Sequence, residues 1–271
     1  MLQPLVITST QNPRIKRLMA LSGKSAERRD TGLIVVEGRR ELFHCVCAGG
    51  EVQEVYCCPS LYDANCAEGD VLSLCRGEHF EVSPTVYNHM AYRGGTEGII
   101  AIVKPRLLTL NDLRLSQKPL IMVLESVEKP GNLGAVLRSA DAAPADAVIV
   151  CDPLTDLYNP NTVRSSMGSI FTVPCVACTS QQCIDFLISR DIQILTAQLQ
   201  DSRPYYDTDM CRGTALVMGT EATGLTDAWR RVADAHIRIP MNGSMDSLNV
   251  SVSAAILLFE AARQRRAGTP F

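Results

Sequence analysis

The second half of the chain alternates short, almost continuously apolar runs with stretches of helical periodicity. Strands are expected at residues 120–124, 147–151, 171–176, 192–197, 215–218 and 237–239, and helices at about 133–141, 181–190, 227–233 and 250–265. Strands that are apolar on both sides and alternate with helices are typical of a mainly parallel sheet covered on both faces. We therefore predict an α/β fold with such a sheet for this half.

The first hundred residues predict a smaller α/β/α domain. Helices are expected at 11–21 and 40–48, the second ending at Gly49-Gly50, and strands at 33–36, 52–57 and 99–103. Residues 104–118 have broken periodicity and a proline near their start, which indicates a partly helical linker. The predicted organisation is a domain at 1–103, a linker at 104–118 and a domain at 119–271.

Length and composition are those of an ordinary globular protein. The chain has 271 residues, of which 46% are hydrophobic and 20% charged, enough to bury a core without disulfides or metals. No apolar run approaches the ~20 residues that a membrane helix needs, and the start does not resemble a signal peptide. We therefore expect a cytoplasmic protein with no membrane partner.

The eleven cysteines do not suggest a special role. An odd number in a chain without a secretion signal argues against a disulfide framework. Cys175 and Cys178 form one close pair and Cys45 and Cys47 another, but neither, even with Cys183 or Cys211 added, has a recognised zinc spacing. We expect no metal, and reduced cysteines that act as small buried hydrophobes.

Basic residues gather near the start of the chain, although the net charge is −3. Residues 1–40 hold eight Lys and Arg against three acids, an excess of five that is suited to contacting phosphates. A solvated helix face explains the same charges equally well. The basic residues are Arg14, Lys16, Arg17, Lys24, Arg28, Arg29, Arg39 and Arg40.

Three segments at expected strand ends carry the chemistry, because ligands of open parallel sheets bind at the carboxyl ends of strands. In the first, a strand ending at Leu124 is followed by Pro130-Gly131 and a helix that begins near Asn132. Arg138 comes six residues later, nearly two helical turns on, and is expected on a neighbouring face. A capped helix with a surface arginine is the plainer interpretation.

The second segment joins a buried strand directly to Gly219-Thr220-Glu221 and then Gly224. Two glycines five residues apart allow a ligand to approach the backbone closely, and Glu221 supplies an acidic group at the sheet edge. An ordinary turn between strand and helix is the alternative.

The third segment follows the strand at 237–239 and is rich in turn residues. Ser247 and Asn249 stand at the head of the last helix, where free backbone N–H groups hold polar or anionic groups. The alternative is that Ser247 or Asn249 simply caps this helix.

Together and in this order, the segments resemble the three motifs of the SpoU (TrmH-type) branch of the SPOUT RNA methyltransferases. The matching residues are Asn132-x-Gly-x-x-x-Arg138, Gly219-x-Glu221-x-x-Gly224-Leu225, and Ile239-Pro240-Met241 followed by Ser247-Leu248-Asn249-Val250-Ser251, with a further similar stretch at Arg164–Phe171. The resemblance spans roughly 119–266.

The first domain resembles, more loosely, the auxiliary substrate-binding domain of this family, which is similar to small ribosomal RNA-binding proteins. The matching residues are Gln11-Asn12-Pro13 with Lys16, Val36-Glu37-Gly38 and Gly98-Ile99-Ile100-Ala101. Thr96-Glu97 stands where Pro-Gln is expected, so this turn departs from the family pattern.

The resemblance implies a deep trefoil knot in the second domain, a homodimer, and S-adenosylmethionine as methyl donor. The donor-binding residues that it implies are Met218, Gly219, Thr220, Gly224, Ile239, Met241, Leu248 and Asn249. The catalytic residues are Asn132, Arg138, Glu221, Ser247 and Asn249. The residues expected to contact RNA are Lys16, Arg28, Arg29, Arg39, Arg40 and Arg164.

The implied reaction transfers a methyl group from a sulfonium to a ribose 2′-hydroxyl, and the implied centre is Arg138. A guanidinium is always protonated, so we expect it to grip a phosphate and stabilise the developing alkoxide rather than act as a base. Asn132 would position Arg138 or the ribose, Glu221 would orient the loops or the substrate, and Ser247 and Asn249 would support the site or relay a proton.

Several functions stay open. The auxiliary domain favours ribosomal RNA over transfer RNA. The alternatives are a SPOUT enzyme that methylates a base nitrogen, an RNA-binding protein that has lost catalysis, and a nucleotide-binding α/β protein whose similarity is accidental.

Overall fold

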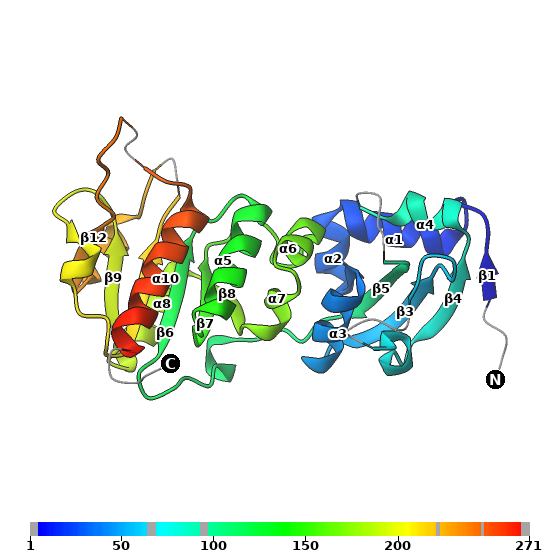
Figure 1. Ribbon diagram of the computed structural model, residues 1–271, viewed down its shortest axis with the longest axis horizontal. Coiled ribbons are helices and arrows are strands. Elements are labelled where there is room, and N and C mark those ends of the chain that lie inside the picture. Colours follow the sequence, from blue (N-terminus) through cyan, green and yellow to red (C-terminus); the bar gives the residue numbers. More distant parts are fainter. Residues whose placement is uncertain (1–4, 64–68, 93–96, 221–222, 245–246, 267–271) are drawn as a thin grey trace. The chain divides into compact units, whose positions relative to one another are not determined.

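The structure is a computed structural model that describes residues 5–63, 69–92, 97–220, 223–244 and 247–266. It forms two compact units, Met1–Arg106 with Tyr158–Thr172 and Leu107–Leu157 with Val173–Phe271 (Figure 1). Residues 158–172, expected in the second domain, thus group with the first unit. The boundaries 1–103 and 119–271 stay a prediction for separately folding domains. In the described ranges, each helix is too short or too polar to cross a bilayer.

The second unit is built on a seven-stranded sheet in which every neighbouring pair is parallel. The strand order is β10-β12-β9-β11-β6-β7-β8. The strands are β6 (Leu120–Glu125), β7 (Ala147–Cys151), β8 (Cys175–Cys178), β9 (Gln193–Ala197), β10 (Arg203–Pro204), β11 (Thr214–Met218) and β12 (Ala235–Arg238). The predicted parallel sheet is confirmed, whereas the implied trefoil knot stays a prediction.

Helices cover both faces of this sheet, as the apolar strands predict. Alternate strand residues such as Ile121 and Ile149 face a core shared with α8 (Ser180–Ser189) and α9 (Asp227–Val232). Helices α5 (Pro130–Ala142) and α10 (Val250–Arg266) pack side by side on the other face (Figure 1). Short 3₁₀ turns, η2 (Leu110–Asp112) and η3 (Tyr205–Asp207), lie in the connections.

The first unit is a mixed five-stranded sheet in the order β1-β4-β3-β5-β2. Its strands are β1 (Leu5–Ile7), β2 (Ile34–Glu37), β3 (Glu51–Cys57), β4 (Glu78–Val82) and β5 (Ile99–Lys104). Its helices are α1 (Pro13–Gly23), α2 (Ser25–Thr31), α3 (Arg39–Cys47), α4 (Pro84–Met90), α6 (Pro160–Ser165) and α7 (Ser169–Thr172), with a 3₁₀ turn η1 (Val71–Leu74). The α/β/α organisation matches the prediction, although β1, β4, α2 and α4 were not anticipated.

One predicted strand, at 171–176, was wrong in its bounds. Ser169–Thr172 forms helix α7, and β8 begins at Cys175, just after Pro174. A short apolar run does not distinguish strand from helix by periodicity, and the proline separates the two elements here.

Arg265 fastens the last helix to the beginning of two strands. Its guanidinium donates to the backbone carbonyls of Lys118 (2.6 Å), Pro119 (3.1 Å) and Arg212 (2.7 Å), and its Nε donates to that of Met210 (2.9 Å). Lys118 and Pro119 immediately precede β6, and Arg212 lies two residues before β11. One side chain therefore ties α10 to the two central strands.

We predict that Arg265→Met lowers the free energy of unfolding of this unit by about 3 kcal/mol, because four carbonyls lose a charged donor. Urea unfolding followed by tryptophan fluorescence measures this, since the single tryptophan, Trp229, lies in the core of this unit. Arg263→Met is the control: the Arg263 side chain is 68% exposed, and its partner Glu260 keeps a hydrogen bond from Gln264, so a much smaller change is expected. Equal losses in the two variants would contradict the role of Arg265.

Candidate functional site

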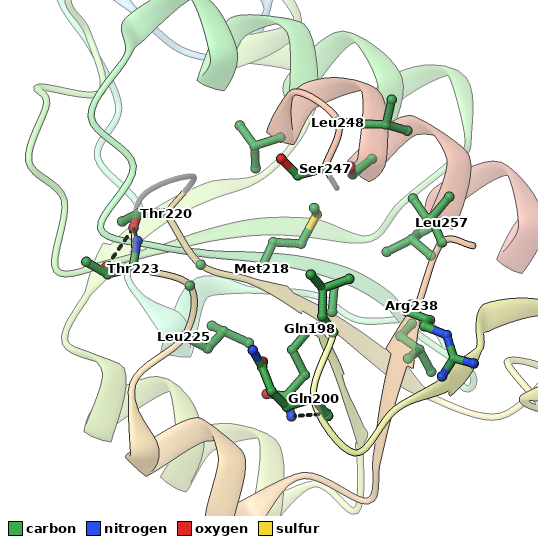
Figure 2. Close-up of a pocket in the computed structure, with 18 of the residues that line it drawn as sticks. Gln198, Gln200, Met218, Thr220, Thr223, Leu225, Arg238, Ser247, Leu248 and Leu257 are labelled. Carbon is green, nitrogen blue, oxygen red and sulfur yellow. Dashed lines mark hydrogen bonds between the residues drawn. The ribbon is translucent and has the colours of Figure 1, made fainter. Parts of the chain in front are cut away.

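A cavity of about 370 Å³ opens at the carboxyl ends of β9, β11 and β12, beside the start of α10 (Figure 2). Side chains of three separate segments, including Met218, Ser247 and Gln198, gather around it. The lining residues are Ala197–Gln200, Met218–Thr220, Thr223–Leu225, Arg230, Ile237–Ile239, Met241, Ser247, Leu248, Val250, Ser253 and Leu257. This is the edge at which an open parallel sheet binds ligands.

Seven of the eight predicted donor-binding residues line this cavity, and Asn249 is the exception. The seven are Met218, Gly219, Thr220, Gly224, Ile239, Met241 and Leu248. Ser247, predicted as catalytic, also lines it. The second and third sequence motifs, far apart along the chain, therefore meet at one cavity.

The wall formed by the second motif is a tight turn that requires both glycines. The N–H of Gly224 donates to the carbonyl of Thr220 (3.1 Å), and the N–H of Thr223 donates to Thr220 Oγ1 (3.0 Å). A Cβ on Gly219 would stand 2.2 Å from the carbonyl carbon and oxygen of Gly224, and Gly224 itself has a φ of +67°. The backbone that approaches Gly219 closely is therefore that of Gly224 in the same turn, rather than a ligand. Glu221 lies outside the described residues.

Sequence reasoning missed the wall that follows β9. Gln198 and Gln200 line the cavity, and the Nε2 of Gln198 donates to the carbonyl of Gln200 (2.9 Å). The Oε1 of Gln198 is buried and accepts no hydrogen bond from any described residue. The position of these residues, directly after an apolar strand at the ligand-binding edge, was the available signal. The free acceptor suits a ligand that carries an N–H or O–H donor.

A second cavity of about 140 Å³ adjoins the first. It shares Gly219, Thr220 and Val250 with the larger cavity and is otherwise lined by residues 124–129 and Asn132. The first motif therefore forms a separate compartment across the glycine turn. Two adjoining compartments can hold two reactants on either side of one loop.

Asn132 and Asn249 join the first motif to the third. Asn132 lies in the first turn of α5, which begins at Pro130 with Lys129 at the N-cap position, so Asn132 does not cap this helix. The Nδ2 of Asn249 donates to the Oδ1 of Asn132 (3.2 Å), while the Oδ1 of Asn249 accepts from the N–H of Ser251 (3.0 Å). Asn249 thus caps α10 and also contacts Asn132 at the second cavity.

Arg138 is not brought into either cavity. It lies on α5 with its side chain exposed, and in the described part of the chain it has no hydrogen-bond or ion-pair partner. An exposed guanidinium without a partner is available to an anion, such as a phosphate.

The predicted RNA-contacting residues differ in how exposed their side chains are and in whether they already bind another group of the protein. Lys16 and Arg29 are exposed, Arg40 is half-buried, and Arg164 pairs with Glu37 (3.8 Å) while staying half-exposed. Arg28 is buried, and its guanidinium donates to the carbonyls of Leu21 and Ser22 at the end of α1. This structural role explains Arg28 without RNA, so we remove it from the predicted surface.

Arg39 is also largely occupied by the protein. Its Nη1 donates to the carbonyl of Asp63, and its side chain is 17% exposed. Its backbone N–H donates to Glu97 Oε2 (2.6 Å), so Glu97, at the position that departed from the family pattern, holds the first residue of α3. Burial raises the pKa of the neighbouring Glu41 carboxyl, and the negative charge of Glu97 adds to the rise. Thr96 lies outside the described residues.

Glu125, at the end of β6, is a buried carboxylate that the sequence did not single out. It accepts from the N–H (2.9 Å) and Oγ1 (2.7 Å) of Thr226 and from Ser180 Oγ (3.1 Å). Ser180 also contacts Asp152 Oδ2 (2.6 Å) and accepts from Trp229 Nε1 (3.3 Å). Since Thr226 directly follows the loop that contains the glycine turn, Glu125 anchors one end of the cavity wall.

Comparison with known proteins agrees with this arrangement. Residues 119–259 match the SpoU rRNA Methylase family, and residues 12–101 match an MRM3-like substrate binding domain. The chain belongs to the SpoU rRNA methylase family, so the predicted family is confirmed.

Individual relatives match along nearly the whole chain. A 23S rRNA (uridine(2479)-2′-O)-methyltransferase of Streptomyces viridochromogenes is 30% identical, over 96% of this chain and 93% of that protein. A crystal structure of an RNA 2′-O ribose methyltransferase has a TM-score of 0.84 at 37% identity, over 96% of this chain and 99% of that one. An AdoMet-bound rRNA methyltransferase from Sinorhizobium meliloti has a TM-score of 0.86 at 29% identity, over 95% and 97%.

We predict that Glu125→Ala lowers the free energy of unfolding of the second unit by about 3 kcal/mol, because the hydrogen bonds that its buried carboxylate accepts from Thr226 and Ser180 are lost. The measurement is again urea unfolding by Trp229 fluorescence. Glu128→Ala removes an exposed carboxylate three residues away and is expected to change stability by about 0.5 kcal/mol or less. The anchoring role is refuted if Glu125→Ala unfolds at the wild-type urea concentration.

Proposed function

We propose that this protein is an S-adenosylmethionine-dependent RNA methyltransferase that methylates a ribose 2′-hydroxyl in ribosomal RNA. The observation that carries the proposal is the meeting of two motifs at the larger cavity, with the Asn132–Asn249 pair at the adjoining one. The activities of two relatives, 2′-O-methylation of 23S rRNA and of RNA, support the same reaction. A cytoplasmic location goes with this proposal.

The larger cavity fits the methyl donor in size and chemistry. A volume of about 370 Å³ lies in the range of pockets for small molecules of this size. Met218, Leu225 and Leu257 provide apolar contacts, while the free Oε1 of Gln198 suits the amino groups of the donor. The relative from Sinorhizobium meliloti was solved with AdoMet bound, which supports this assignment. The donor would supply an electrophilic methyl group on a sulfonium.

The smaller cavity would take the target ribose on the other side of the glycine turn. The side chains of Asn132 and Asn249, which are hydrogen-bonded to each other, would orient the target hydroxyl. Holding the methyl donor and the 2′-hydroxyl in line accounts for much of the rate acceleration of a methyl transfer. Ser247, which lines the donor cavity, would support the site rather than contact the ribose.

Arg138 would act on the RNA electrostatically. Its exposed guanidinium would hold a phosphate next to the target nucleotide and stabilise the negative charge that develops on the 2′-oxygen. Lys16, Arg29, Arg40 and Arg164 of the first unit would contact phosphates elsewhere on the RNA.

A transfer assay with labelled S-adenosylmethionine tests the proposal. Ribosomal and transfer RNA from cells that lack the protein would be separated, methylated and digested, and alkali-resistant dinucleotides would be sought. A labelled resistant dinucleotide from ribosomal RNA is expected. Label from transfer RNA would change the substrate, and label on a base would change the reaction. Donor binding without transfer to mature RNA calls for repeating the assay on ribosome-assembly intermediates, and loss of both would indicate an inactive RNA-binding protein.

We predict that Arg138→Ala lowers the rate of methyl transfer at least about a hundredfold, as expected for a lost electrostatic contact in the transition state. Because Arg138 lines neither cavity, the donor affinity measured by calorimetry should stay within about twofold of wild type. Arg190→Ala, an exposed arginine at the end of α8, is the matched control and should keep full activity. Parallel loss of donor binding would contradict the assigned role.

We also propose a homodimer that forms through helices α5 and α10. These helices pack side by side and expose apolar side chains on α10, with Val252 47% and Phe259 51% exposed. A paired apolar surface of this kind is what a second copy of the chain would cover.

Phe259→Glu is predicted to convert the dimer to a monomer, because a charge at the centre of an apolar interface is costly to desolvate. Size-exclusion chromatography with light scattering measures the mass. Ile188→Glu, which adds the same charge to an exposed apolar position on α8, should remain dimeric. A monomeric wild-type protein, or a dimeric Phe259→Glu variant, would contradict the proposed interface.

A further inference from the structure

Three cysteine thiols that line neither cavity gather at the carboxyl end of strands β7 and β8. Cys151 ends β7, Cys178 ends β8, and Cys183 lies in the first turns of α8. Their three Sγ atoms all lie within 4.8 Å of one another. The sequence did not predict this cluster, because its members are 27 and 5 residues apart and do not form a recognised metal-binding spacing.

Sheet register and helix capping bring these thiols together. Cys151 and Cys178 are directly paired across the parallel strands β7 and β8, so their side chains lie on the same face. The capping box of Thr179 and Gln182 fixes the start of α8, and Cys183 donates its N–H to the carbonyl of Thr179 (3.1 Å). The backbone positions of the three cysteines, set by strand pairing and by the helix cap, therefore place their Sγ atoms close together.

The Cys-x-x-Cys pair noted in the sequence does not meet in this way. Cys175 and Cys178 are three residues apart on one strand, and successive side chains of a strand alternate between faces. Cys175 is accordingly absent from the cluster. Burial raises the pKa of its thiol to about 12, as expected for a small buried hydrophobe.

We propose that Cys151, Cys178 and Cys183 form a binding site for one thiophilic metal ion of the zinc class. Thiolate sulfur is the ligand that zinc and similar soft ions prefer. With zinc–sulfur bonds of about 2.3 Å, tetrahedral ligands lie about 3.8 Å apart, so sulfurs within 4.8 Å need to close by about 1 Å at most. Cys151 and Cys183 are buried, whereas Cys178 is partly exposed, which gives the ion a path and leaves a fourth position for water.

The site also has a connection to the donor cavity. Ser180 lies between two of the proposed ligands, Cys178 and Cys183, and its hydroxyl bonds to Glu125. Glu125 in turn holds Thr226 at the end of the cavity wall. A metal ion that fixes the start of α8 would therefore stabilise this network, whether or not the proposed methylation is correct.

Metal binding to the full-length chain tests the site independently of activity. The reduced protein would be stripped with a chelator, loaded with Zn²⁺, washed with a weak competing chelator, and its metal content measured by mass spectrometry. We expect one retained ion per chain and a raised thermal unfolding midpoint. Loading with Cd²⁺ instead should give the ultraviolet sulfur-to-metal charge-transfer absorption of three thiolates, a measurement that needs no variant.

The variants Cys178→Ser and Cys183→Ser should lose the retained ion, and Cys175→Ser, the matched buried control, should keep it. Circular dichroism of the metal-free proteins checks that each variant folds. Retention in all variants would assign the metal to exposed thiols such as Cys47 and overturn the proposal. No retained ion in the reduced wild-type protein would also overturn it.

Discussion

Parallel pairing of all seven strands is the constraint on which the rest of the second unit depends. Parallel strands cannot be joined by hairpins, so each strand returns through a crossover, and every loop that follows a strand lies at the same edge. The three motifs are dispersed over more than a hundred residues of sequence, yet this topology brings two of them to one cavity and the first to the adjoining one. β6 and β11 are hydrogen-bonded neighbours, so the loops that they lead into must meet.

The buried carboxylate of Glu125 makes this edge rigid. A charge removed from water is tolerated only when hydrogen bonds replace its hydration. Glu125 receives two hydrogen bonds from Thr226 and shares the hydroxyl of Ser180 with Asp152. These donors come from segments that follow β11 and β8, so one residue at the end of β6 fixes two other strand connections. The arrangement allows the glycine turn at 219–224 to present a precise wall to a ligand, because the chain just beyond the turn is anchored.

Much of this was accessible from the sequence, and the exceptions have physical reasons. The apolar strands and the parallel sheet followed from periodicity, and seven residues that line the larger cavity followed from the resemblance to the SpoU motifs. Gln198, Glu125 and the cysteine cluster did not, because their environment depends on strand order and on pairing between distant residues. Strand order is a long-range property, and nothing local in the segment after β9 shows that it lies next to β11 and β12. Arg28 was misjudged because charge alone does not reveal that a guanidinium caps a helix.

The contacts that the basic side chains make within the protein also indicate how such a chain would bind RNA. Arg14 and Arg17 both pair with the buried carboxylate of Glu54, and Arg28 and Arg39 bond largely to backbone carbonyls. Four of the eight basic residues near the start of the chain are therefore engaged by other groups of the first unit, which leaves exposed ones such as Lys16 and Arg29 to contact phosphates. A net charge of −3 leaves little general attraction for a polyanion. Recognition would then rest on shape and on a few well-placed cations, of which the exposed Arg138 is one, and structured RNA is recognised in this way. The proposed homodimer would double the number of such cations along one RNA without changing the sign of the overall charge.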